Sequence, residues 1–360
     1  MSLSSVFHVK EHVLEGSHIR EFPRALSRSQ EDVLKLAVKE YIPKDNPTPK
    51  AGDITIIGAH ANGFPKELYE ALWLDLHAES LKPSSTFRIR SVIIADVAWQ
   101  GASSALNEPL LGNDPGWLHR RLPRRRLRAP PRPRKAFLKS SFYRAWDARV
   151  FDAWVDHGLR DVPTQLYPAS DTTPKGSVTL ATTKHQEVFT FFRPSWYAYD
   201  PSGRDVVRQE LVPDLDPALN ERYFTFPFYR SEGASTLVRL PNLRPGVLYV
   251  FGGASDLSTP ELREEKMRLT GTGVGGSGGA AKGRVREVTL PGAGHLFPME
   301  VPDVSAKLAA EWIEKGLGEW RAEQEDYERW TRLSVREKTT LTEEWMEKFG
   351  APARPPKAKM

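Results

Sequence analysis

Two residues with chemically active side chains each follow a short apolar run that is typical of a strand. Asp256 comes after the run 246–252, and His295 comes after the run 284–290. Open α/β sheets place reacting groups beyond the carboxyl ends of their parallel strands. A carboxylate that orients an imidazole base supports a nucleophile. The order of Asp256 and His295 therefore predicts such a pair, although an aspartate there also serves as a helix cap and a histidine there is often structural.

A third strand end offers backbone donors instead of side chains. The β-branched run 53–58 leads into the turn His60-Ala61-Asn62-Gly63-Phe64-Pro65. We expect the N–H groups of Gly63 and Phe64 to face a developing oxyanion in a reaction of this kind. The alternative is a glycine-containing strand-to-helix turn that carries no chemistry. The sequence leaves both interpretations open.

The elements that would position these residues form a strand–helix–strand unit. A buried strand at 53–58, a helix over 65–81 with Pro65 at its start, and a strand at 87–97 predict a parallel sheet and the α/β class. Further expected elements are an edge strand at 6–14, a half-buried strand at 33–42, an amphipathic helical segment at 137–158, a helix over 260–269 and a helix from 303.

Several segments resemble fungal α/β-hydrolases, in particular those of toxin biosynthesis and the peroxisomal lipase-like enzymes. They are 60–69, 96–115, 182–191, 249–279 and 292–300, and the resemblance spans nearly the whole chain apart from 118–135. It implies an α/β-hydrolase-like, mostly parallel sheet with a helical cap. It also implies a serine-type hydrolase acting on an ester, thioester or lipid-like acyl substrate, with Asp256 as triad acid and His295 as triad base.

The chain departs from that family at the nucleophile. The family's serine lies in a Gly-x-Ser-x-Gly elbow between a strand and a helix, ahead of the acid. The elbow and its elements need ~60 residues, but only about 20, at 117–136, lie between the family-like segment 96–115 and the cap. We therefore expect a sheet truncated in its middle, through a mispredicted splice, an out-of-frame patch or a deletion. The nucleophile is unassigned, and the polypeptide is expected to be inactive.

Other serines do not replace the elbow. The segment 275–279 matches the motif formally around Ser277, but it follows a predicted helix, lies after Asp256 and is rich in glycine. The strain of an elbow must be held by a strand and a helix. Ser103 and Ser104 lack the second glycine, and His185 is expected to be a structural cap residue. The glycine loop opens no strand–helix–strand unit, so no dinucleotide cofactor is expected.

Composition narrows the classes of partner. The formal charge is +5, from 51 Lys+Arg and 46 Asp+Glu, but the stretch 118–134 alone holds eight Arg and no acid. The remainder carries 43 basic and 46 acidic residues, a net charge of −3. Binding of nucleic acid through 118–134 remains a minor alternative, because no aromatic residue interleaves the arginines. No cysteine is present, no spacing suits a metal site, and neither a signal peptide nor a membrane span is expected.

The sequence supports three interpretations of function and contains one candidate targeting signal. A hydrolase of acyl substrates is favoured over a non-catalytic relative that binds a small molecule or a protein, and over a nucleic-acid binder. The terminal Ala358-Lys359-Met360 resembles a peroxisomal address, which predicts an import receptor as partner and a peroxisomal, otherwise cytoplasmic, location. The expected regions are the first half of the core at 1–117, a disordered stretch at 118–135, a cap at 136–235, the second half of the core at 236–316 and a helical tail at 317–360.

Overall fold

The computed structural model describes residues 2–16, 18, 25–112, 137–170, 174, 176–191, 196–212 and 236–350. The chain divides into two units, Met1–Glu311 and Trp312–Met360. The Arg/Pro-rich stretch predicted at 118–135 and the terminal tripeptide both lie entirely outside the described residues.

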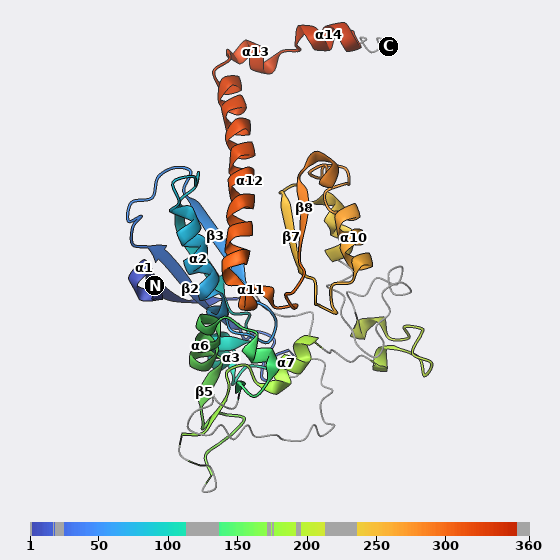
Figure 1. Cartoon of the computed structure of the whole chain (residues 1–360). Helices are drawn as coiled ribbons and strands as arrows, with labels where there is room; N and C mark the ends of the chain where they lie inside the picture. The colour runs from blue at the N-terminus through green and yellow to red at the C-terminus, as the bar shows by residue number, and fades with distance from the viewer. Residues whose placement is uncertain are drawn as a thin grey trace. The chain divides into compact units, whose positions relative to one another are not determined.

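The N-terminal part of the chain forms a four-stranded mixed sheet (Figure 1). Its order is β1-β2-β4-β3, with β2 antiparallel to both β1 and β4, and β3 parallel to β4. β1 pairs along its whole length with β2, so the edge strand predicted at 6–14 is confirmed. The strands are β1 (Phe7–Glu15), β2 (Lys35–Pro43), β3 (Ile54–Ala59) and β4 (Ile89–Ala95).

A short 3-10 helix and an α-helix connect β3 to β4, which confirms the predicted strand–helix–strand unit. The 3-10 helix η1 covers Lys66–Tyr69, and α2 continues over Glu70–Ser80. A Cβ atom at Gly58 of β3 would lie 2.9 Å from the ring of Trp73 in α2. The absence of a side chain at this position therefore allows the helix to approach the strand closely.

The prediction that β3 is buried is wrong. Ile57, in the middle of the strand, keeps 83% of its surface exposed. Parallel strands normally have both faces covered by neighbouring elements. Among the described residues β3 pairs only with β4, so its other edge is open and its apolar side chains lack a cover.

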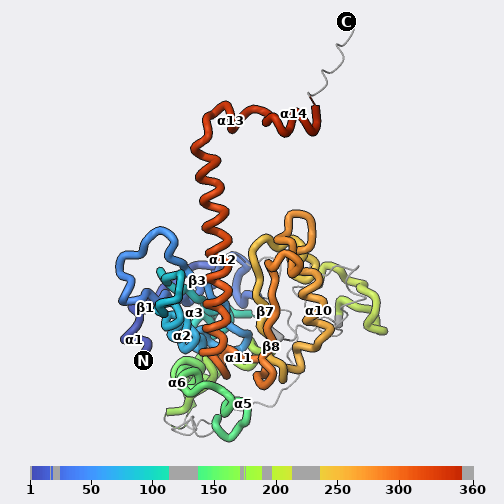
Figure 2. Tube along the Cα trace, turned by 45° about the horizontal axis from the view of Figure 1, so that its top comes forward, coloured from blue at the N-terminus to red at the C-terminus, as the bar shows by residue number. Residues whose placement is uncertain are grey.

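The second half of the core holds a separate parallel pair. β7 (Val247–Gly252) is followed by α10 (Pro260–Leu269), and β8 (Val285–Leu290) then returns parallel to β7 (Figure 2). Thr259 caps α10 by accepting the N–H of Leu262, with Pro260 at the first helical position. Val247 to Val250 are only half-buried, so the predicted buried strand is present but incompletely covered.

The helical segment predicted at 137–158 consists of two helices. Asp147 interrupts it by capping the second helix, where its carboxylate accepts the N–H of Arg149 at 2.8 Å. Trp146, Val150 and Trp154 lie in a buried cluster with Leu68 and Met299. The elements of this region are α3 (Gly101–Asn107), α5 (Ser141–Arg144), α6 (Ala148–His157), β5 (Leu159–Asp161), β6 (Val178–Leu180), α7 (Lys184–Phe191), η2 (Trp196–Ala198) and η3 (Gln209–Leu211).

A long helix, α12 (Pro302–Thr331), runs through the boundary between the two units. Beyond that boundary Trp320, Tyr327 and Trp330 are exposed. In the part of the chain that is described, no helix has the length and apolar character to cross a membrane. The remaining elements are α1 (Leu3–Val6), η4 (Leu240–Asn242), η5 (Ala280–Lys282), α11 (Phe297–Glu300), α13 (Val335–Thr339) and α14 (Glu343–Phe349).

Candidate active site

The turns that follow β7 and β8 lie in direct backbone contact. The N–H of Gly253 donates to the carbonyl of Leu290 at 2.8 Å, and the N–H of Ala254 donates to that of Ala293 at 3.0 Å. A Cβ atom at Gly252 would lie 1.9 Å from the carbonyl oxygen of Gly294, so no larger residue fits there. The two predicted catalytic positions therefore lie at one edge of this strand pair.

The side chain that reaches the His295 ring is Ser255. Its Oγ lies 3.5 Å from His295 Nδ1. Asp256 is exposed, and within the described residues no hydrogen bond or ion pair joins its carboxylate to the imidazole. The structure thus brings Asp256 and His295 to the same edge without the contact that an acid–base pair needs, and the pair stays a prediction.

Both predicted oxyanion donors already have acceptors. Gly63 donates its N–H to Gln100 Oε1 at 2.9 Å, and Phe64 donates its N–H to the carbonyl of Ala61 at 3.3 Å. Gly63 has a φ of 87°, a conformation that favours glycine. An oxyanion at this turn would have to displace the Gln100 side chain, and its binding there also stays a prediction.

His60, in the same turn, is held as a neutral imidazole. Its Nε2 accepts the N–H of Val97 at 3.0 Å, so the ring proton lies on Nδ1, which donates to the carbonyl of Ala61 at 2.9 Å. With both nitrogens engaged by the backbone, the ring ties the end of β3 to the end of β4 and is not available as a base.

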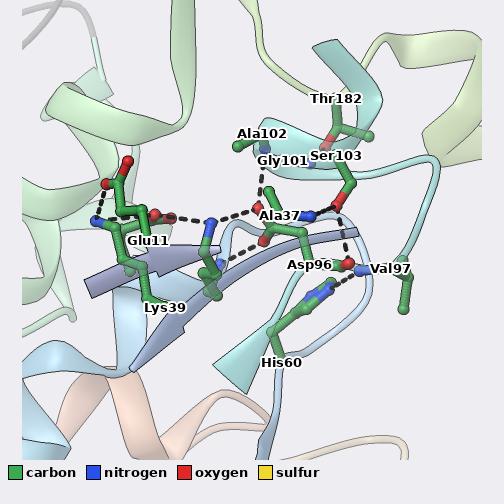
Figure 3. Close-up of polar contacts among 12 residues, drawn as sticks. Glu11, Ala37, Lys39, His60, Asp96, Val97, Gly101, Ala102, Ser103 and Thr182 are labelled. Carbon is green, nitrogen blue, oxygen red and sulfur yellow. Dashed lines mark hydrogen bonds and ion pairs between the residues drawn. The ribbon is translucent and has the colours of Figure 1, made fainter. Parts of the chain in front are cut away.

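The structure reveals a buried carboxylate that sequence analysis did not identify as functional. Asp96 is fully buried at the end of β4, and Oδ2 accepts both Lys66 Nζ at 2.8 Å and the N–H of Ala102 at 2.9 Å. Oδ1 accepts the backbone N–H of Lys66 at 2.9 Å. A Cβ atom at Gly101 would lie 2.5 Å from this carboxyl group. Asp96 therefore joins the start of η1, the end of β4 and the start of α3 (Figure 3).

Alternating charges extend from Asp96 toward β2. Lys66 Nζ also lies 3.0 Å from Glu67, which lies 3.1 Å from Lys39 Nζ, and Lys39 in turn lies 3.4 Å from Glu70. Burial lowers the pKa of the Lys66 ammonium, but Asp96 and Glu67 outweigh it and raise the pKa above its ordinary value. Buried ions need such partners, because the desolvation of an unpaired charge is expensive. The only sequence signal was Lys-Glu at the start of a predicted helix, which usually faces water.

None of the serines weighed as substitutes reaches His295, and the hydroxyl of Ser104 is buried without a hydrogen-bond partner among the described residues. Ser103 donates its hydroxyl to the Asp96 carbonyl at 2.9 Å and accepts the N–H of Ala37 at 2.8 Å. Ser104 is buried in the same helix. Ser277 lies in the glycine loop after α10, where its Oγ accepts the N–H of Gly279 at 3.4 Å. His185 is exposed in the first turn of α7. Within the described residues none of these side chains contacts His295.

Metal chemistry finds no support in the described part of the chain. No group of three His, Cys, Asp or Glu side chains there is arranged to hold a metal ion.

Comparison with known proteins places these features in a family. No family model matches the chain. It is 33% identical over 400 aligned residues to the type I acyl-CoA thioesterase mpaH of Penicillium roqueforti, covering 88% of this chain and 90% of that protein. It is 34% identical to mpaH' of Penicillium brevicompactum, with 88% and 89% covered. It is 32% identical to the abhydrolase domain-containing protein ACTT2-1 of Alternaria alternata over 49% of this chain and 58% of that protein.

A solved structure shares the fold. The peroxisomal α/β-hydrolase Lpx1 of Saccharomyces cerevisiae matches with a TM-score of 0.58 at 12% identity, covering 87% of this chain and 90% of Lpx1. The α/β-hydrolase fold class predicted from the sequence is confirmed by this likeness. Since relatives above 30% identity are covered along nine-tenths of their length, the chain belongs to the α/β-hydrolase superfamily.

Proposed function

We propose that this chain is an acyl hydrolase of serine-hydrolase ancestry that retains its base, His295, and lacks the segment carrying its nucleophile. The substrate class is an ester or thioester of a carboxylic acid, an assignment supported by the acyl-CoA thioesterase name of the Penicillium relatives. Without the attacking serine the polypeptide does not turn over such substrates. The predicted acid Asp256 and the predicted oxyanion donors Gly63 and Phe64 belong to the same proposal.

The length of the alignment carries the proposal. The match to mpaH runs over 400 positions but includes 88% of 360 residues, which is about 317 residues. Roughly 80 positions of the alignment therefore have no residue of this chain opposite them, more than the ~60 residues that an elbow with its strand, helix and next strand takes. The loss of a neighbouring strand and helix would leave β3 with an unpaired edge and Ile57 exposed to solvent, as they are in this structure.

Two experiments test the proposal. The first is to sequence the transcript across codons 117–136, where we expect a Gly-x-Ser-x-Gly in a skipped exon or another frame. The second replaces 117–136 with the matching segment of mpaH and measures hydrolysis of a p-nitrophenyl ester and an acyl-CoA thioester. The chain as it stands should be inactive, and the restored chain should be active.

Matched variants separate the outcomes. In the restored chain, His295→Ala should lower kcat by at least about 10³-fold. Turnover by the unrestored chain that survives His295→Ala would contradict the proposal. A continuous exon together with a folded but inactive restored chain would instead favour a non-catalytic relative that binds a small molecule or a protein.

A peroxisomal location forms a second part of the proposal. The tripeptide Ala358-Lys359-Met360, where it ends the translated protein, is the address for a peroxisomal import receptor. Lpx1, which shares the fold, is a peroxisomal α/β-hydrolase. A fluorescent protein fused ahead of the tail should collect in peroxisomes, and removal of the tripeptide should return it to the cytosol. Unchanged distribution would refute the address.

A further inference from the structure

The His295 ring has a hydroxyl neighbour on the side where a triad acid would be expected. Ser255 Oγ lies 3.5 Å from Nδ1, the nitrogen that a triad acid contacts. Asp256, the next residue, is exposed to solvent. Asp256 is thus the acid that the family resemblance predicts, whereas Ser255 is the residue whose side chain lies next to the ring.

The position of the Ser255 side chain is set by its own loop. Its N–H donates to the carbonyl of Gly252 at 3.2 Å, and its Oγ accepts the N–H of Leu257 at 3.2 Å. The N–H of Leu257 uses one lone pair of the oxygen, which leaves a second lone pair to accept a hydrogen bond from the ring N–H.

The turn that carries the imidazole is fixed as well. The N–H of Gly294 donates to Glu300 Oε2 at 2.8 Å, which ties this turn to α11. Ala254 and Ala293 join the two turns by their 3.0 Å backbone hydrogen bond. The backbone of both turns is therefore fixed by hydrogen bonds. Ser255 is half-buried, whereas His295 and Asp256 are both exposed.

We infer that Ser255 is the positioning residue for His295, and that it holds the imidazole in its Nδ1–H tautomer in place of a carboxylate. The inference rests on the proposed function, because it concerns the same base. The hydrogen bond at one ring nitrogen decides which nitrogen carries the proton. With the proton on Nδ1 donated to Ser255, Nε2 keeps its lone pair and can accept a proton from an attacking hydroxyl.

A hydroxyl in this role has a chemical consequence. A carboxylate stabilises the imidazolium that forms when the base takes a proton, whereas a neutral hydroxyl orients the ring without supplying that charge. Ser255 therefore secures the tautomer and orientation of His295 but supplies no negative charge to the imidazolium.

The test is spectroscopic and needs no turnover, so its failure is distinct from failure of the proposed function. The full chain is labelled with ¹⁵N-histidine, and His295→Gln identifies the ring signals by their loss. In alkaline solution, long-range ¹H–¹⁵N spectra of the wild type should show the Nδ1–H tautomer. Ser255→Ala should shift the tautomer ratio roughly tenfold toward Nε2–H, the effect of losing one hydrogen bond of ordinary strength.

Two further variants serve as controls. Ser255→Thr keeps the hydroxyl and should retain the wild-type tautomer, which a merely structural role for Ser255 would not require. Asp256→Asn should leave the tautomer of His295 unchanged. An Nε2–H tautomer in the wild type, or a His295 signal that responds to Asp256→Asn and not to Ser255→Ala, would overturn the inference and return the role to Asp256.

Discussion

The exposure of Ile57 in the middle of β3 leads to a quantitative prediction about the free energy of unfolding. Ile57 keeps 83% of its surface in contact with water, so folding buries only about one-sixth of it. Full burial of an isoleucine contributes about 1.5–3 kcal/mol. The share realised at Ile57 is therefore about 0.5 kcal/mol or less. Ile57→Thr keeps a β-branched side chain, so the preference of the residue for strand conformation is preserved.

The matched control lies on the neighbouring strand. Ile94 of β4 is 1% exposed, and its backbone pairs in register with Gly58 of β3. Ile94→Thr removes buried apolar surface and places a hydroxyl in the core, which together should lower the free energy of unfolding by about 3 kcal/mol or more. The two variants differ in burial while the chemical change is the same.

Urea denaturation followed by circular dichroism measures both effects. We expect the midpoint for Ile57→Thr to stay within error of the wild type and the midpoint for Ile94→Thr to fall markedly at an unchanged slope. A loss at Ile57 comparable to that at Ile94 would show that another segment or a second molecule covers β3 in solution. That result would refute the open edge on which the proposal of a missing strand depends.

Three further predictions concern the buried charges. Lys66→Met should lower the free energy of unfolding by about 3–5 kcal/mol in urea denaturation, because it leaves Asp96 buried without its cation. Burial raises the pKa of Glu67, but Lys66 and Lys39 outweigh it and hold the pKa below the ordinary 4.5. The free energy of unfolding should therefore fall as the pH drops through and below that value. Glu67→Gln should flatten this decline, measured as a series of urea midpoints at different pH values. Gly101→Ala should lower the thermal midpoint by several degrees, because its Cβ would strike Asp96 and its φ is 53°; an unchanged midpoint would contradict the geometry.

The topology of the first half of the chain could be predicted because it depends on local patterns. The β-branched runs at β3 and β4 and the proline before η1 are visible in the sequence, and the parallel crossover follows from their spacing. The burial of β3 could not be predicted in this way, since it depends on whether another strand and helix lie beside it. An isoleucine at position 57 gives the same apolar pattern in the sequence whether its side chain is buried or exposed.

The sequence predicts which residues lie at the strand ends of the site, but it does not predict which side chains are in contact there. The positions of Asp256 and His295 beyond β7 and β8 follow from the chain, but the 3.5 Å contact of Ser255 depends on the backbone of two turns. The burial of Asp96 and Lys66 was also missed, because charged residues ordinarily face water and no sequence period distinguishes an ion pair in the core.

The separation of the strands into independent sheets also affects how the molecule unfolds. β7 and β8 share no ladder hydrogen bonds with β1 to β4 within the described residues, so melting one sheet does not strip the other of its partners. Cooperative units of this kind exchange their amide hydrogens with separate opening free energies. The turn that carries His295 is nevertheless tied to α11, whose Met299 is buried with Leu68 and Trp146, so the two sheets are coupled through side-chain packing and not through ladder hydrogen bonds.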